Sequence, residues 1–254
     1  MYYEVYGPDD GKLTPILFLQ GLAGELVGWK ILTQYLSSKR QCILMDNRDC
    51  GKGDRSHGGY TIEDMADDAA GLLLHLGKTK VNVVGHSMGG CIALALAIRH
   101  PSVIHKLFLA STNARPGRYH GFHPIAAWKY LAESGAPRSV IAAQFTAMCM
   151  SARFIEDHPK QPLYEWPQVS QNPAEFVRQC DAFLRFDAVD QLPRLECPLL
   201  VYVGDQDILA PVVNSREIHE LVPGSLLYIN EGFSHASLFE DVGHSIQMID
   251  NFLL

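Results

Sequence analysis

Residues 81–91 read Val-Asn-Val-Val-Gly-His-Ser-Met-Gly-Gly-Cys, and this stretch decides the fold. The short apolar run before Gly85 is typical of a buried strand, and the apolar run at residues 91–98 predicts a helix. A Gly-x-Ser-x-Gly pattern between a strand and a helix indicates a tight turn that exposes its serine. The sequence therefore predicts that Ser87 is a nucleophile at the end of a buried strand.

The two glycines of the pattern fit such a turn, since it leaves no room for side chains at Gly85 and Gly89. The hydroxyl of Ser87 would then lie at the N-terminus of a helix, where the backbone amides and the helix dipole favour negative charge. A Gly/Ser turn of this composition also arises by chance. The interpretation therefore depends on finding a base and an acid elsewhere in the chain.

The composition is that of an ordinary globular protein. The 254 residues fit one α/β domain with an inserted subdomain, and 47% of them are apolar while 19% are charged. A net charge of -7 argues against nucleic acid or an anionic membrane as a partner. The first five residues do not resemble a signal peptide, and no apolar run approaches the ~20 residues of a membrane span. The six scattered cysteines predict reduced thiols in a cytoplasmic protein.

Short apolar runs alternate with longer amphipathic ones along most of the chain. Expected strands lie at residues 15–20, 41–46, 80–85, 104–111, 197–204 and 225–230, and expected helices at 26–38, 61–76, 91–100, 211–221 and 236–253. Thr61 is a candidate N-cap for the second of these helices. This alternation predicts a parallel sheet covered by helices on both faces.

The alternation stops between residues 113 and 192, where a helical pattern rich in aromatic residues shows no clear strand. We expect a core made of residues 1–112 and 193–254, with residues 113–192 inserted as a helical cap. Candidate substrate-binding residues are Gly21 and the cap residues Phe122, Trp128, Phe145, Met148 and Trp166. For each cap residue, packing in the helical core is the alternative.

The cap also carries arginines at positions 115, 118, 138, 153, 178 and 185. One of them could bind a substrate carboxylate, and together they could dock an acidic carrier protein. The alternative is that they are solvated surface charges.

A serine hydroxyl needs a base, and the base needs an acid to orient it. In an open α/β sheet, both should lie in loops at the carboxyl ends of later strands. The expected strand 197–204 is followed by Asp205 and Asp207, and His235 lies in the loop after the last expected strand. We favour Asp207 as the acid, because Asp205 directly follows the strand's glycine, where an aspartate commonly caps a turn.

Two backbone amides are needed to hold a developing oxyanion. Met88 directly follows the serine, and Leu22 lies in the Gly-Leu-Ala-Gly loop after the strand at 15–20. We expect the amides of Leu22 and Met88 to form the oxyanion hole. The alternative for this glycine-rich loop is phosphate binding, but its spacing matches neither a dinucleotide-binding fingerprint nor a P-loop.

Together with residues 46–51, 60–65, 204–207 and 232–235, the serine turn makes the chain similar to the α/β-hydrolase fold superfamily over essentially its whole length. In the overall pattern of its sequence it is most similar to 3-oxoadipate enol-lactonases and small carboxylesterases. The resemblance implies a mostly parallel central sheet of about seven to eight strands, with helices on both faces and a helical cap insertion. It also implies that the aspartate of the Gly-x-x-Asp pattern, Asp207, is catalytic.

The chain departs from the family pattern in three places. Gln20 replaces the usual histidine before Gly21, Asp49 replaces a usual glycine, and the chain begins at what resembles the second strand of the family's sheet. None of these departures removes a candidate catalytic group.

The residues and the resemblance together predict a serine hydrolase that cleaves a small carboxylic ester or lactone through an acyl-enzyme, with no cofactor and no metal. The pair His120 and His123 lacks a third ligand nearby, which argues against a metal site there. Alternatives are an acyltransferase or lyase of the same fold, or a ligand-binding protein that keeps the triad.

Overall fold

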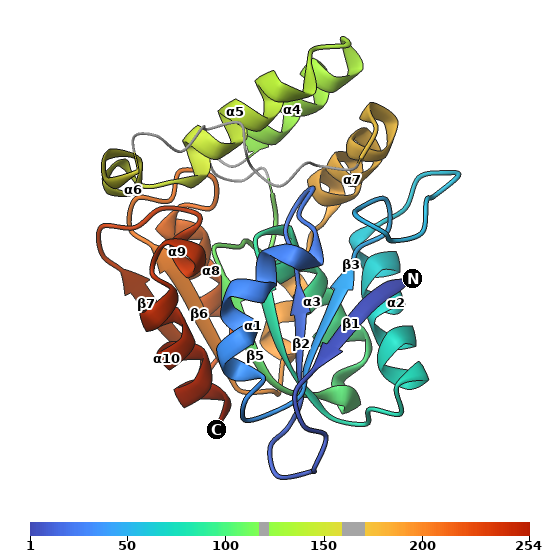
Figure 1. The fold of residues 1–254 in the computed structure, drawn as a ribbon, viewed down its shortest axis with the longest axis vertical. Helices are drawn as coiled ribbons and strands as arrows, with labels where there is room; N and C mark the ends of the chain where they lie inside the picture. The colour runs from blue at the N-terminus through green and yellow to red at the C-terminus, as the bar shows by residue number, and fades with distance from the viewer. Residues whose placement is uncertain (117–121, 159–170) are drawn as a thin grey trace.

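The computed structural model describes residues 1–116, 122–158 and 171–254, with the side chains of Phe122 and His123 outside this description. A seven-stranded sheet with the order β1-β3-β2-β4-β5-β6-β7 runs through this part of the chain (Figure 1). Its strands are β1 (Tyr2–Tyr6), β2 (Ile16–Leu19), β3 (Cys42–Asp46), β4 (Val81–His86), β5 (Ile104–Ala110), β6 (Leu199–Gly204) and β7 (Leu226–Asn230). All neighbouring strands are parallel except β1, which pairs antiparallel with β3.

The edge strand β1 was not expected from the sequence. Its residues pair in register with β3, from Tyr2 opposite Asp46 to Tyr6 opposite Cys42. All five residues of β1 are exposed or only half-buried. An edge strand with so little burial lacks the continuous apolar run that marks the inner strands, so its sequence gives a weak signal.

Helices cover both faces of the sheet. They are η1 (Leu26–Trp29), α1 (Lys30–Leu36), α2 (Ile62–His75), α3 (Met88–Arg99), η2 (Pro101–Val103), α8 (Val212–Leu221), α9 (Ser237–Glu240) and α10 (Val242–Leu253). Because side chains alternate along a strand, Leu17 packs in one hydrophobic cluster with α2 and α3, while Phe18 packs in a second with α1 and α10. No helix among the described residues has the length and apolarity needed to cross a bilayer.

Local sequence explains where α2 begins. The hydroxyl of Thr61 accepts a hydrogen bond from the amide of Asp64 at 3.2 Å, and the Asp64 carboxylate accepts one from the amide of Thr61 at 2.8 Å. This capping box satisfies two amides that the helix itself leaves unpaired. The capping role that the sequence suggested for Thr61 is confirmed.

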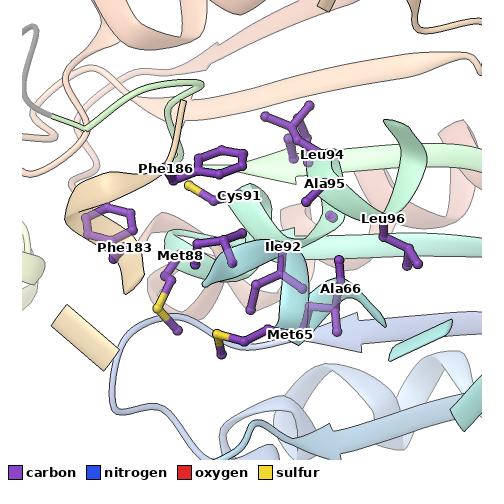
Figure 2. Close-up of a cluster of buried hydrophobic side chains, with 14 of the residues drawn as sticks. Met65, Ala66, Met88, Cys91, Ile92, Leu94, Ala95, Leu96, Phe183 and Phe186 are labelled. Atoms are coloured by element: carbon purple, nitrogen blue, oxygen red, sulfur yellow. The ribbon is translucent and has the colours of Figure 1, made fainter. Parts of the chain in front are cut away.

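Helix α3 lies at the centre of the larger hydrophobic cluster. Its residues from Met88 to Ala97 are all buried, and its side chains meet those of α2 and of Phe183 and Phe186 (Figure 2). A helix that is buried on nearly all sides has little freedom to shift. The serine at its N-terminus is therefore anchored to a helix that is buried within the larger hydrophobic cluster.

Between β5 and β6 the chain forms an insertion, residues 111–198. Its elements are α4 (Phe122–Glu133), α5 (Arg138–Cys149), α6 (Ala152–Asp157), α7 (Pro173–Arg185) and η3 (Val189–Arg194). Figure 1 shows α4, α5, α6 and α7 beyond the upper ends of the strands. The described part of the insertion is helical, as expected, whereas the division into core and cap at residues 113 and 192 stays a prediction.

Candidate active site

Ser87 connects β4 to α3 in a strained backbone conformation, with φ 55 and ψ -125. A Cβ atom added at Gly85 would lie 2.5 Å from the carbonyl oxygen of Gly89, and one added at Gly89 would overlap the carbonyl oxygen of Leu19. Both positions therefore require glycine. This turn places the Ser87 hydroxyl at the N-terminus of α3, in the setting that the sequence predicted.

The Ser87 turn is also held from β5 and the residues after it. The amide of Ser87 donates to the carbonyl oxygen of Ala110 at 2.9 Å. The carbonyl oxygen of Ser87 accepts from the hydroxyl of Thr112 at 2.7 Å and from the amide of Gly90 at 2.8 Å. Sequence reasoning did not single out Thr112, because its partner lies 25 residues away.

Asp207 and His235 form a buried pair in the loops after β6 and β7. The Nδ1 atom of His235 donates to the Asp207 carboxylate, at 2.9 Å from Oδ2 and 3.0 Å from Oδ1. The two loops are joined directly, since the amide of Gln206 donates to the carbonyl oxygen of Phe233 at 2.9 Å. The structure thus brings together two of the three predicted catalytic side chains.

Two aspartates follow β6, and they have different surroundings. Asp207 is 4% exposed, and its Oδ1 also accepts from the amides of Leu209 at 2.9 Å and Ala210 at 2.8 Å. Asp205 is exposed and accepts a turn amide, that of Gly232, at 2.7 Å. Burial raises the pKa of Asp207, but the charge and hydrogen bonds of His235 and the two amides outweigh burial and bring it below its ordinary value.

His86, the last residue of β4, contacts the His235 loop. Its Nε2 atom lies 3.0 Å from the carbonyl oxygen of His235, and the two imidazole rings are 5.1 Å apart. Burial, with the neighbouring charge of His235, lowers the pKa of His86 to about 3. A neutral His86 therefore fixes the backbone of His235 next to the Ser87 turn. Sequence reasoning missed this role, although the position of His86 directly before Ser87 could have indicated it.

The loop after β2 lies against the Ser87 turn. A Cβ atom added at Gly21 would lie 3.0 Å from the Cβ of Ser87 and 3.3 Å from the carbonyl oxygen of His86. Gln20, which replaces the family's histidine, is buried, and its Oε1 accepts from the amide of Gly21 at 2.9 Å. Asn47 donates to the carbonyl oxygen of Gln20 at 3.0 Å. These bonds place Leu22, the next residue, beside the serine turn and bury it.

A cavity of about 340 Å³ lies between this loop and the insertion. Leu22 and Ala23 line it from the loop, and the other lining residues belong to the insertion: Ala132, Ala136, Arg138, Ser139, Ile141, Ala142, Phe145, Gln171, Asn172, Pro173 and Phe176. Most of the wall is apolar. A volume of this size suits a small molecule.

The predicted cap residues have different surroundings. Phe145 lines the cavity. Trp128 is 1% exposed and its ring lies 4.9 Å from that of Phe145, while Met148 packs against the larger hydrophobic cluster. Trp166 and the side chain of Phe122 lie outside the described residues.

Among the described arginines of the insertion, some form ion pairs, one lines the cavity, and Arg153 and Arg185 are exposed at the surface. Arg178 binds the fully buried side chain of Asp49 at 2.9 Å, and Arg115 pairs with Asp187 at 3.3 Å. Arg138 lines the cavity, whereas Arg118 lies outside the described residues. His120 and the side chain of His123 also lie outside them, and the described residues contain no group of three potential metal ligands.

Comparison with known proteins gives relatives over nearly the whole chain. RutD of Caulobacter sp. (strain K31), which is named as a carbamate hydrolase, is 28% identical over 235 residues, or 90% of this chain and 86% of RutD. 3-Oxoadipate enol-lactonase 2 of Acinetobacter baylyi is 28% identical over 251 residues, or 97% of this chain and 91% of the lactonase. These similarities support hydrolase activity.

Solved structures agree with the sequence relatives. The enol-lactonase from Burkholderia xenovorans LB400 is similar with a TM-score of 0.89 and 25% identity, covering 99% of this chain and 95% of that one. A thermophilic esterase from Thermogutta terrifontis has a TM-score of 0.86 and 27% identity, covering 99% and 92%. The predicted fold class and the resemblance to enol-lactonases are confirmed.

One match identifies the family directly. The family described as alpha/beta hydrolase fold matches residues 14–140, which are half of the chain. Given this match and the mostly parallel sheet with helices on both faces, the chain belongs to the alpha/beta hydrolase fold family.

Proposed function

We propose that this protein is a serine hydrolase that cleaves a carboxylic ester or lactone through an acyl-enzyme. One observation carries the proposal: His235, which forms a buried pair with Asp207, accepts through its backbone carbonyl a hydrogen bond from His86, the residue directly before the strained Ser87. Nucleophile, base and acid occur in the chain order of α/β-hydrolases. The lactonase and esterase among the similar proteins support the same chemistry.

In this mechanism, Oγ of Ser87 attacks the carbonyl carbon while Nε2 of His235 takes its proton. Asp207 holds Nδ1–H of the imidazole and stabilises the positive charge that forms. The amides of Leu22 and Met88 bind the oxyanion of the tetrahedral intermediate. Collapse breaks the ester bond, and His235 returns the proton to the leaving oxygen. Water then repeats the cycle on the acyl-enzyme, releasing the acid and free Ser87.

The substrate is a small molecule, and its acyl part occupies the cavity next to Leu22 and Ala23. The apolar wall favours an aliphatic or alicyclic group there. Neither nucleic acid nor membrane is required as a partner. The six free cysteines fit the cytoplasmic location that we expect from the sequence.

Carbamate cleavage is the second candidate, because RutD carries that name. A carbamate also presents a carbonyl carbon to Ser87, so the same residues would act in the same order. Ester and carbamate cleavage would differ in the leaving group and in the stability of the covalent enzyme intermediate. The two candidate functions therefore differ in substrate preference and not in the catalytic residues.

Turnover of short- and medium-chain p-nitrophenyl esters, a panel of lactones and a carbamate by the purified protein tests the proposal. We expect ester or lactone turnover that falls to background in Ser87→Ala and is unchanged in Ser134→Ala, a substitution of an exposed serine at the end of α4. A fluorophosphonate should label the wild type stoichiometrically and leave Ser87→Ala unlabelled. Equal turnover by wild type and Ser87→Ala would refute the nucleophile.

A further inference from the structure

Gln179 of α7 reaches from the insertion to the loop after β2. Its side chain is completely buried. Oε1 of Gln179 accepts a hydrogen bond from the amide of Ala23 at 2.7 Å. Ala23 has a φ of 58, a left-handed conformation that is costly for alanine. A buried contact from 156 residues away therefore supports a strained residue directly after Leu22.

Other contacts fix the Gln179 side chain. Its Nε2 donates to the sulfur of Cys50 at 3.3 Å, and its Oε1 also accepts from Nε2 of Gln171 at 3.2 Å. Burial raises the pKa of the Cys50 thiol to about 12, so this partner stays uncharged. With donor and acceptor atoms both engaged, Gln179 has one orientation, and its Oε1 points at the loop.

In the loop after β2, side chains hold the amides of Gly21 and Ala23, and the amide of Leu22 lies between them. Gln20 holds the amide of Gly21 at 2.9 Å, and Gln179 holds the amide of Ala23 at 2.7 Å. The peptide between these two joins Gly21 to Leu22, and its carbonyl oxygen accepts from the amide of Gly24 at 3.1 Å. Because N–H and C=O point in opposite directions in a trans peptide, the amide of Leu22 is directed away from Gly24.

We propose that Gln179 is a positioning residue for the oxyanion hole, which fixes the Leu22 amide through its bond to Ala23 and so couples the insertion to catalysis. The inference rests on the proposed function, because Leu22 donates to an oxyanion only in a serine hydrolase. The part of the inference that concerns structure, namely that Gln179 fixes the backbone of residues 21–23, can be tested even if the protein has no hydrolase activity.

The alternative is that Gln179 only attaches α7 to the sheet. The adjacent Arg178 does so, since it binds the buried carboxylate of Asp49 at 2.9 Å, and Asp49 in turn accepts from the amide of Ser56 at 2.7 Å. Arg178 makes no bond to the peptides between residues 20 and 23. Arg178→Met is therefore a matched control, because it changes the neighbouring residue of the same helix and breaks an anchor without touching the loop.

The test compares Gln179→Met, which removes the acceptor at similar length, with Gln179→Glu, whose protonated carboxyl keeps an acceptor and a donor. Loss of an oxyanion donor typically costs ~10²–10³ in rate, so we expect Gln179→Met to lower kcat by roughly 10- to 100-fold with little change in KM. Affinity for a trifluoromethyl ketone, whose adduct carries an oxyanion, should fall by the same factor as kcat/KM. Gln179→Glu should recover most of the loss, and Arg178→Met should lower Tm with kcat nearly unchanged.

A second measurement does not depend on turnover. Amide hydrogen exchange at Ala23, whose amide donates to Gln179, should accelerate in Gln179→Met and stay slow in Arg178→Met when the variants are compared with wild type by NMR. Unchanged exchange at Ala23 would overturn the proposal, as would wild-type kcat and ketone affinity in a Gln179→Met enzyme with lowered Tm. Inactivity of the wild type, or full activity of Ser87→Ala, would instead refute the proposed function. In that case the amide hydrogen-exchange measurement alone would decide whether Gln179 controls the loop.

Discussion

The Nε2–H of His86 donates to the carbonyl oxygen of His235 across 3.0 Å, and the carbonyl allows no other direction of donation. The bond joins the last residue of the central strand β4 to the loop that carries the candidate base. The other ring nitrogen of His86, Nδ1, is buried without a partner among the described residues. His86 is thus a neutral imidazole held inside the protein, which has a consequence for acid stability.

We expect His86 to make the fold acid-sensitive. Its pKa is about 3 in the folded protein, against 6.5 ordinarily, because burial and His235 disfavour its charged form. Between these two values the unfolded chain binds the extra proton, so the free energy of unfolding falls as pH drops below about 6.5, by up to about 1.4 kcal/mol per pH unit. Urea unfolding at pH 7, 6 and 5 measures this slope.

The control for this prediction is a second histidine. His86→Gln, which keeps a donor, should flatten the slope below pH 6.5, whereas replacement of the exposed His57 by glutamine should leave it unchanged. If His86→Gln and the wild type lose stability in parallel as pH falls, the slope comes from other groups.

The identity of the acid can be decided by two amide substitutions. Asp207→Asn keeps the shape but no longer accepts well from Nδ1 of His235, and such a change in a catalytic triad costs ~10⁴ in kcat. Asp205→Asn should stay within a few-fold of wild type, because Asp205 is exposed and its side chain accepts from the turn amide of Gly232 rather than from His235. Steady-state kinetics on one ester suffices, and a larger loss in Asp205→Asn would reverse the assignment.

A methyl group at position 21 should impair catalysis. In Gly21→Ala the new Cβ would lie 3.0 Å from the Cβ of Ser87, so the loop or the serine must move. A misplacement of about 1 Å can cost about 10²-fold in rate, so we expect Gly21→Ala to lower kcat/KM by about tenfold or more. Gly58→Ala is the control, since its added Cβ would meet nothing within 4 Å. Full activity of Gly21→Ala would show that the loop does not hold the reacting carbonyl.

Filling the cavity should change chain-length preference. Ala142 lines the cavity from α5, and Ala142→Leu would occupy part of its roughly 340 Å³. The ratio of kcat/KM for a medium-chain over a short-chain ester should fall by about tenfold or more, because a methylene in an apolar pocket is worth roughly 10- to 200-fold. Val140→Leu, at an exposed position of the same helix, should keep the ratio. An unchanged ratio in Ala142→Leu would place the acyl group elsewhere.

The sequence predicted the parts of this molecule that depend on local pattern. The turn around Ser87 has its own signature of glycines between an apolar strand and an apolar helix, and the structure places it there. The positions of Asp207 and His235 follow from strand order, because parallel strands end at one edge of the sheet. Their catalytic roles stay a prediction.

Contacts between distant segments could not be predicted in this way. Thr112 and Gln179 act on residues 25 and 156 positions away, and a single sequence carries no pattern for such pairs. Trp128 illustrates a second gap. Its helix, α4, carries apolar residues on more than one side, so the sequence pattern does not decide which of them face the cavity. In the structure the indole packs against the ring of Phe145 and is only 1% exposed.

The bonds of Arg178 and Gln179 to the sheet's loops also restrict how such a protein could be recombined. An experimenter who transplants a foreign segment in place of residues 113–192 to obtain a new substrate range would delete both bonds at once. The chimaera would then keep Ser87, Asp207 and His235 but lack the support under Ala23. We therefore expect a successful swap to need its own acceptor at the place of Gln179, since the segment that would set specificity also carries the bond to Ala23.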